Sequence, residues 1–79
     1  MKTGEVVGSV WATRKAESLM GQTFLVVRCG QEELVAADQV GAGKGDRVLL
    51  VMGTVASRVC MESPVDAAVV AIVDREKWQ

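Results

Sequence analysis

Short apolar segments rich in valine alternate with turn-forming residues along the whole chain. β-Branched residues favour extended backbone, and most of the glycines and the single proline fall between these segments, so the pattern predicts β-strands joined by tight turns. Five strands are expected: Glu5–Thr13, Thr23–Cys29, Glu33–Asp38, Arg47–Met52 and Ala67–Asp74. We therefore predict one all-β domain that spans residues 1–79.

The segments between the predicted strands carry their own local signals. Residues 30–32 have the length of a glycine-containing hairpin turn, and the polar stretch Arg14–Gln22 is expected to be a loop. The segment Gly41–Asp46 is rich in glycine, which allows positive φ values at several points. Thr54–Arg58 predicts a short helical turn, with Thr54 as its N-cap.

Five short strands with these turns predict a small closed or nearly closed barrel, because closure removes the exposed edges that recruit other chains. An open sandwich is the alternative. Alternation along the first strand assigns its residues to two faces. One face is expected to carry Val6, Gly8, Val10 and Ala12, and the other Glu5, Ser9 and Thr13.

The second, fourth and fifth predicted strands do not alternate between apolar and polar residues. Their apolar runs are Phe24–Val27, Val48–Met52 and Ala67–Val73. Such runs are expected where both faces of a strand are covered, but so short a chain leaves nothing of its own to cover the outside of a barrel. We expect outward residues such as Val26 to pack against a neighbouring copy, because exposed apolar area is unfavourable by roughly 25 cal/mol per Å².

Composition also indicates partner subunits as the way to stabilise so small a core. A domain of this size buries only roughly 60% of the surface of its unfolded chain, and natural examples add a disulfide, a metal or partners. The chain has no histidine, and its two cysteines, Cys29 and Cys60, lie far apart, which disfavours a zinc site. Strand-like sequence follows Met1 without a signal-peptide pattern, so we expect a cytosolic protein with both thiols reduced.

Charge and hydropathy argue against two classes of partner. The net charge is −1, and acidic and basic residues are mixed along the chain, so no basic stripe is present to neutralise a phosphate backbone. The longest apolar run, Ala67–Val73, is far shorter than the about 20 residues that cross a bilayer. We therefore expect neither a nucleic acid nor a membrane as partner.

Few residues carry candidate chemistry. Gly41–Asp46 could bind an anion through its backbone amides, but it lacks the GK[ST] ending of a P-loop and lies between strands, so a tight turn is expected. Four aspartates adjoin turns or strand ends, where aspartate hydrogen-bonds backbone amides: Asp38, Asp46, Asp66 and Asp74. Without histidine the cysteines lack an activating base. We expect no catalytic site, metal or cofactor.

The aromatic residues allow two interpretations. Large aromatic side chains are enriched at protein interfaces, which favours subunit contacts through Trp11, Phe24 and Trp78. The alternative is a small barrel binding module, either for single-stranded nucleic acid or as a protein adaptor. A single-strand binder interleaves aromatic and basic residues in a groove, and only Trp11 with Arg14 and Phe24 with Arg28 come near that pattern.

Three separate blocks of sequence resemble the EutN/CcmL family, and together they cover nearly the whole chain in order. The opening block is Gly4-x-Val6-x-Gly8-x-Val10, followed by Thr13-x-Lys15 and Leu19-x-Gly21. The central block is Val35-Ala36-x-Asp38-x-Val40-Gly41-Ala42-Gly43-x-Gly45-Asp46-x-Val48-Leu49. The closing block is Pro64-Val65-Asp66-Ala67-Ala68-Val69-Val70-x-Ile72-Val73-Asp74.

The resemblance implies a small five-stranded OB-like β-barrel that assembles as a cyclic pentamer. Members of this family occupy the vertices of bacterial microcompartment shells in the cytoplasm, beside hexameric shell proteins. The resemblance therefore implies a structural role, with further copies of the chain and hexameric shell proteins as partners. Many members carry a Gly-Ser-Ser-Ala-Arg-like segment near the ring centre. The corresponding candidate segment here is Gly53, Thr54, Val55, Ala56, Ser57 and Arg58, in which the arginine is shifted by one place.

Further residues are candidates for contacts with neighbouring subunits or with the shell. They are large aromatic residues, an outward strand residue and the glycine-rich connection: Trp11, Phe24, Val26, Gly41, Ala42, Gly43 and Trp78.

Overall fold

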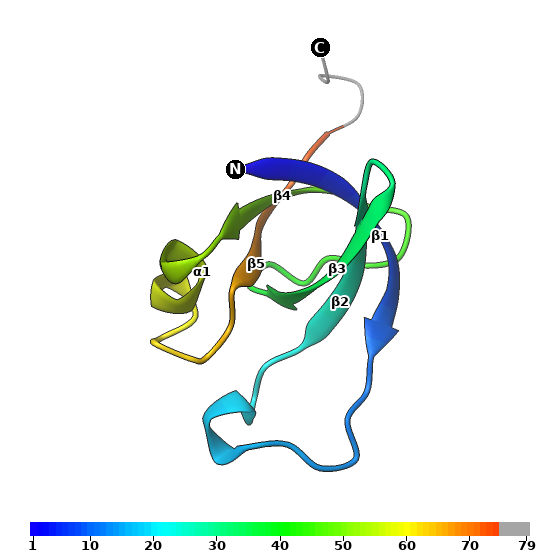
Figure 1. Ribbon diagram of the computed structural model, residues 1–79. Coiled ribbons are helices and arrows are strands. Elements are labelled where there is room, and N and C mark those ends of the chain that lie inside the picture. Colours follow the sequence, from blue (N-terminus) through cyan, green and yellow to red (C-terminus); the bar gives the residue numbers. More distant parts are fainter. Residues whose placement is uncertain (75–79) are drawn as a thin grey trace.

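The computed structural model describes residues 1–74, which form a closed five-stranded barrel with one short α-helix on its outside (Figure 1). The strands are β1 Lys2–Val10, β2 Phe24–Cys29, β3 Glu32–Asp38, β4 Arg47–Met52 and β5 Ala67–Ile72. The helix α1 spans Thr54–Val59, and a single 3₁₀ turn, η1, spans Glu17–Leu19 within the long loop after β1. The predicted OB-like barrel with its short helical turn is confirmed, and the open sandwich is wrong.

The strands follow the order β1-β2-β3-β5-β4, and β4 pairs with β1 to close the barrel. Neighbouring strands are antiparallel except for β3 and β5, which are parallel. The parallel pair follows from the crossover through β4 and α1, which returns the chain to the free side of β3 (Figure 1). Closure gives each strand a neighbour on both sides. The pairing is partial in two places, because β3 and β5 pair at only two positions and β1 pairs with β4 only over residues 2–5.

The first strand differs from its prediction in position and in the faces of its residues. It begins at Lys2, where it pairs with β4, and it ends at Val10, opposite the first residue of β2. A β-bulge between Val6 and Gly8 then shifts the register by one residue, which reverses the alternation. Val6 therefore points into the barrel, whereas Gly8 and Val10 lie on the outer face with Val26 and Phe24 opposite them.

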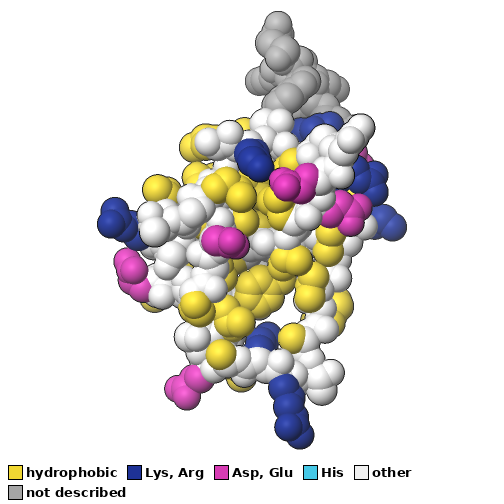
Figure 2. Space-filling view, viewed as in Figure 1, with side chains coloured by type: hydrophobic (Ala, Val, Ile, Leu, Met, Phe, Trp, Pro, Cys, Tyr) yellow, Lys and Arg dark blue, Asp and Glu magenta, His cyan; other side chains and the backbone are white. Residues whose placement is uncertain are grey.

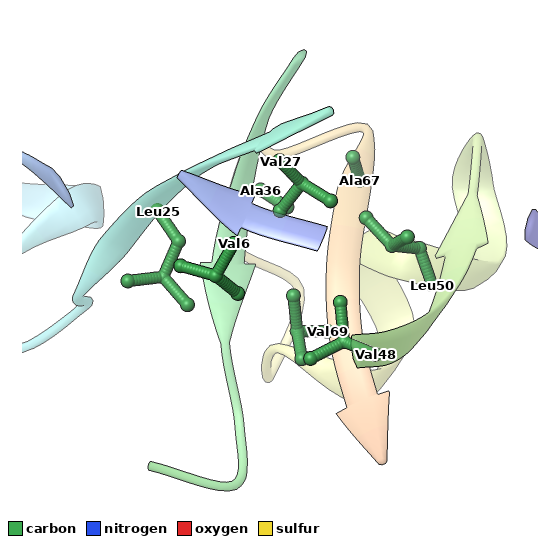
Figure 3. Packing of buried hydrophobic residues seen from close by; sticks show 8 residues of the cluster. All are labelled: Val6, Leu25, Val27, Ala36, Val48, Leu50, Ala67 and Val69. Atoms are coloured by element: carbon green, nitrogen blue, oxygen red, sulfur yellow. The ribbon is translucent and has the colours of Figure 1, made fainter. Parts of the chain in front are cut away.

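The inside of the barrel is filled by aliphatic side chains from all five strands. Figure 3 shows them converging on one another: Val6, Leu25, Val27, Ala36, Val48, Leu50, Ala67 and Val69. Each is at most 2% exposed. Gly4 faces the same interior, and a Cβ atom there would lie 2.6 Å from Cγ1 of Val27 and 2.7 Å from the carbonyl oxygen of Arg28. The barrel is therefore too narrow at this level for any side chain on Gly4.

The helix α1 covers part of the outside of the barrel, where we had expected the chain to leave the strands bare. Ala56 and Cys60 are four residues apart and share one side of the helical segment, and both pack against Ala68 on the outer face of β5. The predicted N-cap is wrong, because Gly53 precedes the helix with φ 68° and ψ −146° and makes no side-chain hydrogen bond. That backbone conformation favours glycine, and it places Thr54 inside the first turn.

Candidate functional site

The outer face of β1, β2 and β3 carries an apolar patch, which we call the strand surface: Val10, Phe24, Val26 and Val35. Strand pairing sets these side chains side by side, because Val10 lies opposite Phe24 and Val26 lies opposite Val35. Val35 is 50% exposed and Val10 38% exposed. Two of the residues proposed from the sequence, Phe24 and Val26, therefore lie together on an incompletely covered apolar surface.

An open groove of about 190 Å³ runs beside the strand surface. Phe24 and Val35 form one wall, and Leu19 of the long loop and the segment Pro64–Asp66 form the others. In Figure 2 hydrophobic side chains gather over the middle of this face, where β2 and β3 run in Figure 1. The groove is therefore apolar along its floor, with one exposed carboxylate, that of Asp66, at its border.

The next row of residues on the same outer face is charged. Glu5 pairs with Arg28, and Arg28 pairs with Glu33 across β2 and β3. The guanidinium of Arg28 donates a hydrogen bond to a carboxylate oxygen of Glu33 at 3.1 Å, and both side chains are more than half exposed. Charged residues therefore mark where the strand surface ends.

A second exposed apolar patch, which we call the helix surface, lies over α1, the end of β4 and the N-terminus: Met1, Val51, Met52, Val55 and Val59. Val55 and Val59 are one helical turn apart and are 52% and 43% exposed. An open groove of about 300 Å³ lies between Met1 and Val55. In Figure 1 this region lies on the left of the barrel, whereas β1 and β2 lie on the right.

The segment proposed for the ring centre forms α1 and its N-cap. Its inner side is fixed to the barrel, since the amide of Gly53 donates to the carbonyl oxygen of Asp66 at 2.8 Å and Ala56 is fully buried. The hydroxyl of Ser57 donates to the carbonyl oxygen of Ser63 at 2.7 Å. Thr54, Val55 and Arg58 are exposed and remain available for contacts.

The glycine-rich connection is a compact turn held by two carboxylates. Oδ1 of Asp38 accepts hydrogen bonds from the amides of Val40 and Gly41 at 3.1 and 3.2 Å. Oδ2 of Asp46 accepts one from the amide of Gly43 at 2.8 Å. These bonds confirm the expectation that both aspartates bind backbone amides, and they occupy donors that an anion would need. Ala42 packs against the barrel interior, so the turn also closes one end of the core.

The long loop after β1 exposes a tryptophan beside basic residues. Trp11 is 91% exposed, and together with Lys15, Phe24 and other residues it lines a small hollow between the loop and the end of the barrel. Figure 2 shows this hollow below the apolar face. Trp78, the other tryptophan proposed from the sequence, lies outside the described residues.

The cysteines are separate and unpaired with each other. Cys60 is 1% exposed beneath the end of α1, and this burial raises the pKa of its thiol above the ordinary value of 9.0 because desolvation disfavours the thiolate. Cys29 is half-buried and packs against the side chains of the barrel interior. Within residues 1–74 no group of three metal-binding side chains comes together. No helix in the same range is long and apolar enough to cross a membrane.

Several residues of the two surfaces escaped the sequence analysis: Met1, Val35, Val51, Met52 and Val59. Val35 was recoverable in principle, because a two-residue turn at Gly30 and Gln31 fixes the hairpin register and sets Val35 opposite Val26. Val55 and Val59 show a spacing of four, which is the helical signal for a shared side.

The described residues define a small closed barrel that exposes two apolar surfaces on its outside. A family model described as "Ethanolamine utilisation protein EutN/carboxysome" matches residues 1–74. The chain belongs to the EutN/CcmL family, which confirms the resemblance seen in its sequence.

Individual relatives agree along most of the chain. The carboxysome shell vertex protein CcmL of Synechococcus elongatus is 47% identical over an alignment that covers 94% of this chain and 84% of the relative. The solved structure of GrpN, a pentameric microcompartment shell protein from Rhodospirillum rubrum, is 41% identical with a TM-score of 0.83, covering 94% and 95% of the two chains.

A second solved structure, that of a pentameric shell protein from the RMM microcompartment, is 31% identical with a TM-score of 0.90 and covers 100% of this chain and 96% of its own. These three relatives are named as shell proteins. The prediction of a structural rather than a catalytic protein is confirmed by that agreement.

Proposed function

We propose that this chain is a structural subunit of a bacterial microcompartment shell, and that five copies close into a ring that occupies a vertex. The observation that carries the proposal is the presence of two separate exposed apolar surfaces on a closed barrel. The relatives named as vertex and pentameric shell proteins support it.

Closure of the barrel determines how copies can associate. Because every strand of the closed barrel has a neighbour on both sides, no whole strand edge is left for a further strand from a neighbouring copy. Contact is expected mainly from side chains on the outer surface. Covering apolar area there is favourable by roughly 25 cal/mol per Å², so both surfaces drive association.

A vertex position follows from the geometry of shells. A flat layer of hexagonal units cannot close, and five-fold units at the corners supply the missing curvature. We further propose that hexameric shell proteins are the partners of the ring and that the compartment lies in the bacterial cytoplasm. The rim contacts are assigned to the exposed Trp11 and to the turn Gly41–Gly43, whose two glycines are exposed, together with Trp78.

The N-cap and helix Gly53–Arg58 face the centre of the ring. This orientation is supported by the burial of Ala56 against the barrel and by the hydrogen bond from Ser57 to Ser63, which leave Thr54 as the exposed polar residue at the start of the helix that faces the opening.

The binding-module alternative lacks support on the surface that it would use. The strand surface has no basic residue within it. Arg28 at its charged border is paired with Glu33, and Lys15 is the single basic residue that lines the hollow beside Trp11 and Phe24. A single-strand groove needs free cations between its aromatic platforms. The relatives named as shell proteins favour the structural role as well.

The vertex role is tested by shell closure. Hexameric microcompartment shell proteins are expressed with this chain and without it, and the products are imaged by electron microscopy. We expect closed polyhedra when the chain is present and open sheets or tubes when it is absent. A variant with charge on the strand surface, Val26→Asp, should resemble the absence of the chain. Equally closed polyhedra in all three samples would contradict the proposal.

A further inference from the structure

The two apolar surfaces occupy different sides of the molecule and come from different elements. The strand surface belongs to β1, β2 and β3, and the helix surface belongs to α1, the end of β4 and the N-terminus (Figure 1). A ring generated by one rotation needs two distinct surfaces on each copy, whereas a surface that pairs with itself produces a two-fold dimer. The chain therefore carries the two distinct surfaces that a closed ring requires.

The charges at the borders of the two surfaces are opposite. Asp66 lines the groove beside Val35, and Arg58 follows Val55 by three residues, which sets it on the same side of α1. Both side chains are exposed, and neither forms an ion pair within residues 1–74. Opposite charges favour contact between unlike surfaces and disfavour contact between two helix surfaces.

The two surfaces also offer a helical stripe and a groove. Val55 and Val59 form an exposed apolar stripe along the outer side of α1, because its other side is fixed to the barrel by Ala56. The groove beside the strand surface is open and apolar, with Phe24 and Val35 along one wall. An apolar helical stripe seated in an apolar groove is a recurrent mode of protein recognition.

From these observations we propose that the strand surface of each copy binds the helix surface of the next. The stripe of Val55 and Val59 lies in the neighbour's groove beside Val35, and Arg58 approaches the neighbour's Asp66. This inference rests on the proposed five-membered ring and deepens it by naming the two halves of the contact.

Two variants, each with one surface blocked, test the assignment by native mass spectrometry. Val35→Asp blocks the strand surface, and Val55→Asp blocks the helix surface. We expect the unaltered chain at about 42 kDa, five times the 8.4 kDa of one chain, and each variant alone as a monomer. An equimolar mixture should form a dimer with one copy of each variant, because each contributes the surface that the other has lost.

The mixture is measured at a concentration on the order of 100 µM of each variant, since a single contact lacks the gain in affinity that ring closure provides. Gln31→Asp is the matched control, because it adds the same charge at an exposed turn of the β2–β3 hairpin, outside both surfaces. We expect this control to remain a five-chain ring.

The outcomes separate the inference from the proposed function. A five-chain ring from either blocked variant, or monomers alone in the mixture, would overturn the pairing of surfaces while the unaltered ring stands. A monomeric unaltered chain would overturn the ring itself. If Val35→Asp does not fold, Val35→Lys replaces it, because the aliphatic stem of lysine lets its charge reach water without disturbing the strand.

Discussion

The two faces of the β2–β3 hairpin carry similar side chains in different surroundings. On the inner face Leu25 and Val27 are 2% and 0% exposed, whereas on the outer face Val35 is 50% exposed. Burial of the inner side chains is complete within a single chain, but burial of the outer ones needs a second copy. The inner apolar residues of the hairpin thus stabilise the fold, whereas the outer ones are available to stabilise the assembly. Substitutions on the inner face should lower the stability of the single chain, and substitutions on the outer face should weaken association.

The largest effect is expected inside the barrel at Gly4. In Gly4→Val the new side chain would overlap Val27 and the backbone of Arg28, since even a Cβ atom would lie within 2.8 Å of three atoms there. Backbone cannot move away without opening the pairing of β1 with β2, so we expect loss of the folded barrel. Far-UV circular dichroism and the yield of soluble protein measure the outcome.

Gly8→Ala is the matched control for Gly4. Gly8 lies in the same strand on the outer face, and a Cβ atom there meets nothing within 4 Å. The far-UV circular dichroism spectrum of Gly8→Ala should equal that of the unaltered chain. A folded, soluble Gly4→Val protein would show that the interior at this level is wider than the packing indicates.

A smaller effect is expected from truncating one side chain on each face. Leu50→Ala removes a fully buried side chain and should lower the free energy of unfolding by about 2–5 kcal/mol at any protein concentration. Val35→Ala should change the stability of the single chain by less than about 1 kcal/mol. Its main effect should be on assembly, because stability that comes from association depends on concentration.

Urea unfolding at two protein concentrations distinguishes these cases. The midpoint for Leu50→Ala should fall at both concentrations, whereas Val35→Ala should reduce the difference between the two midpoints that the unaltered chain shows. A concentration-independent midpoint in the unaltered chain would remove the distinction between the inner and outer faces.

The strand bounds were predicted well where nearby residues in the sequence determine where a strand ends. The second and fourth strands were placed to within one residue, because their apolar runs end close to Gly30 and Gly53. The first strand was displaced by three residues at each end, since its start is set by pairing with β4, a contact between distant parts of the sequence. The bulge after Val6 reverses the alternation of the strand, and nothing in the local sequence marks its position.

The candidate site was predictable only in part for a related reason. Phe24 and Val26 stood out in an apolar run, and their outward position follows from alternation. Val35 was hidden among other apolar residues of its strand, and only the hairpin register reveals its face. The cover that α1 provides over Ala68 was not foreseen, because a six-residue helix leaves too short a pattern to show where it docks.

Packing of α1 on the barrel creates a second buried apolar cluster outside the barrel interior, and this cluster contains Cys60. Burial under α1 raises the pKa of the Cys60 thiol. The unfolded chain therefore loses this proton at lower pH than the folded one. The protonated Cys60 thiol therefore contributes to the free energy of unfolding. This contribution is fully present below the ordinary pKa of 9.0, and it is lost as the pH rises through the higher pKa of the folded state.

The smallest expected effect is thus a difference in alkaline slope between two cysteine variants. From about pH 8 upward, the free energy of unfolding should fall less steeply with pH in Cys60→Ala than in the unaltered chain. Cys29→Ala keeps Cys60 and should retain the steeper slope, so it controls for removal of a thiol elsewhere. Urea unfolding at successive pH values measures the slopes. Equal slopes in Cys60→Ala and the unaltered chain would show that α1 does not shield Cys60 from water.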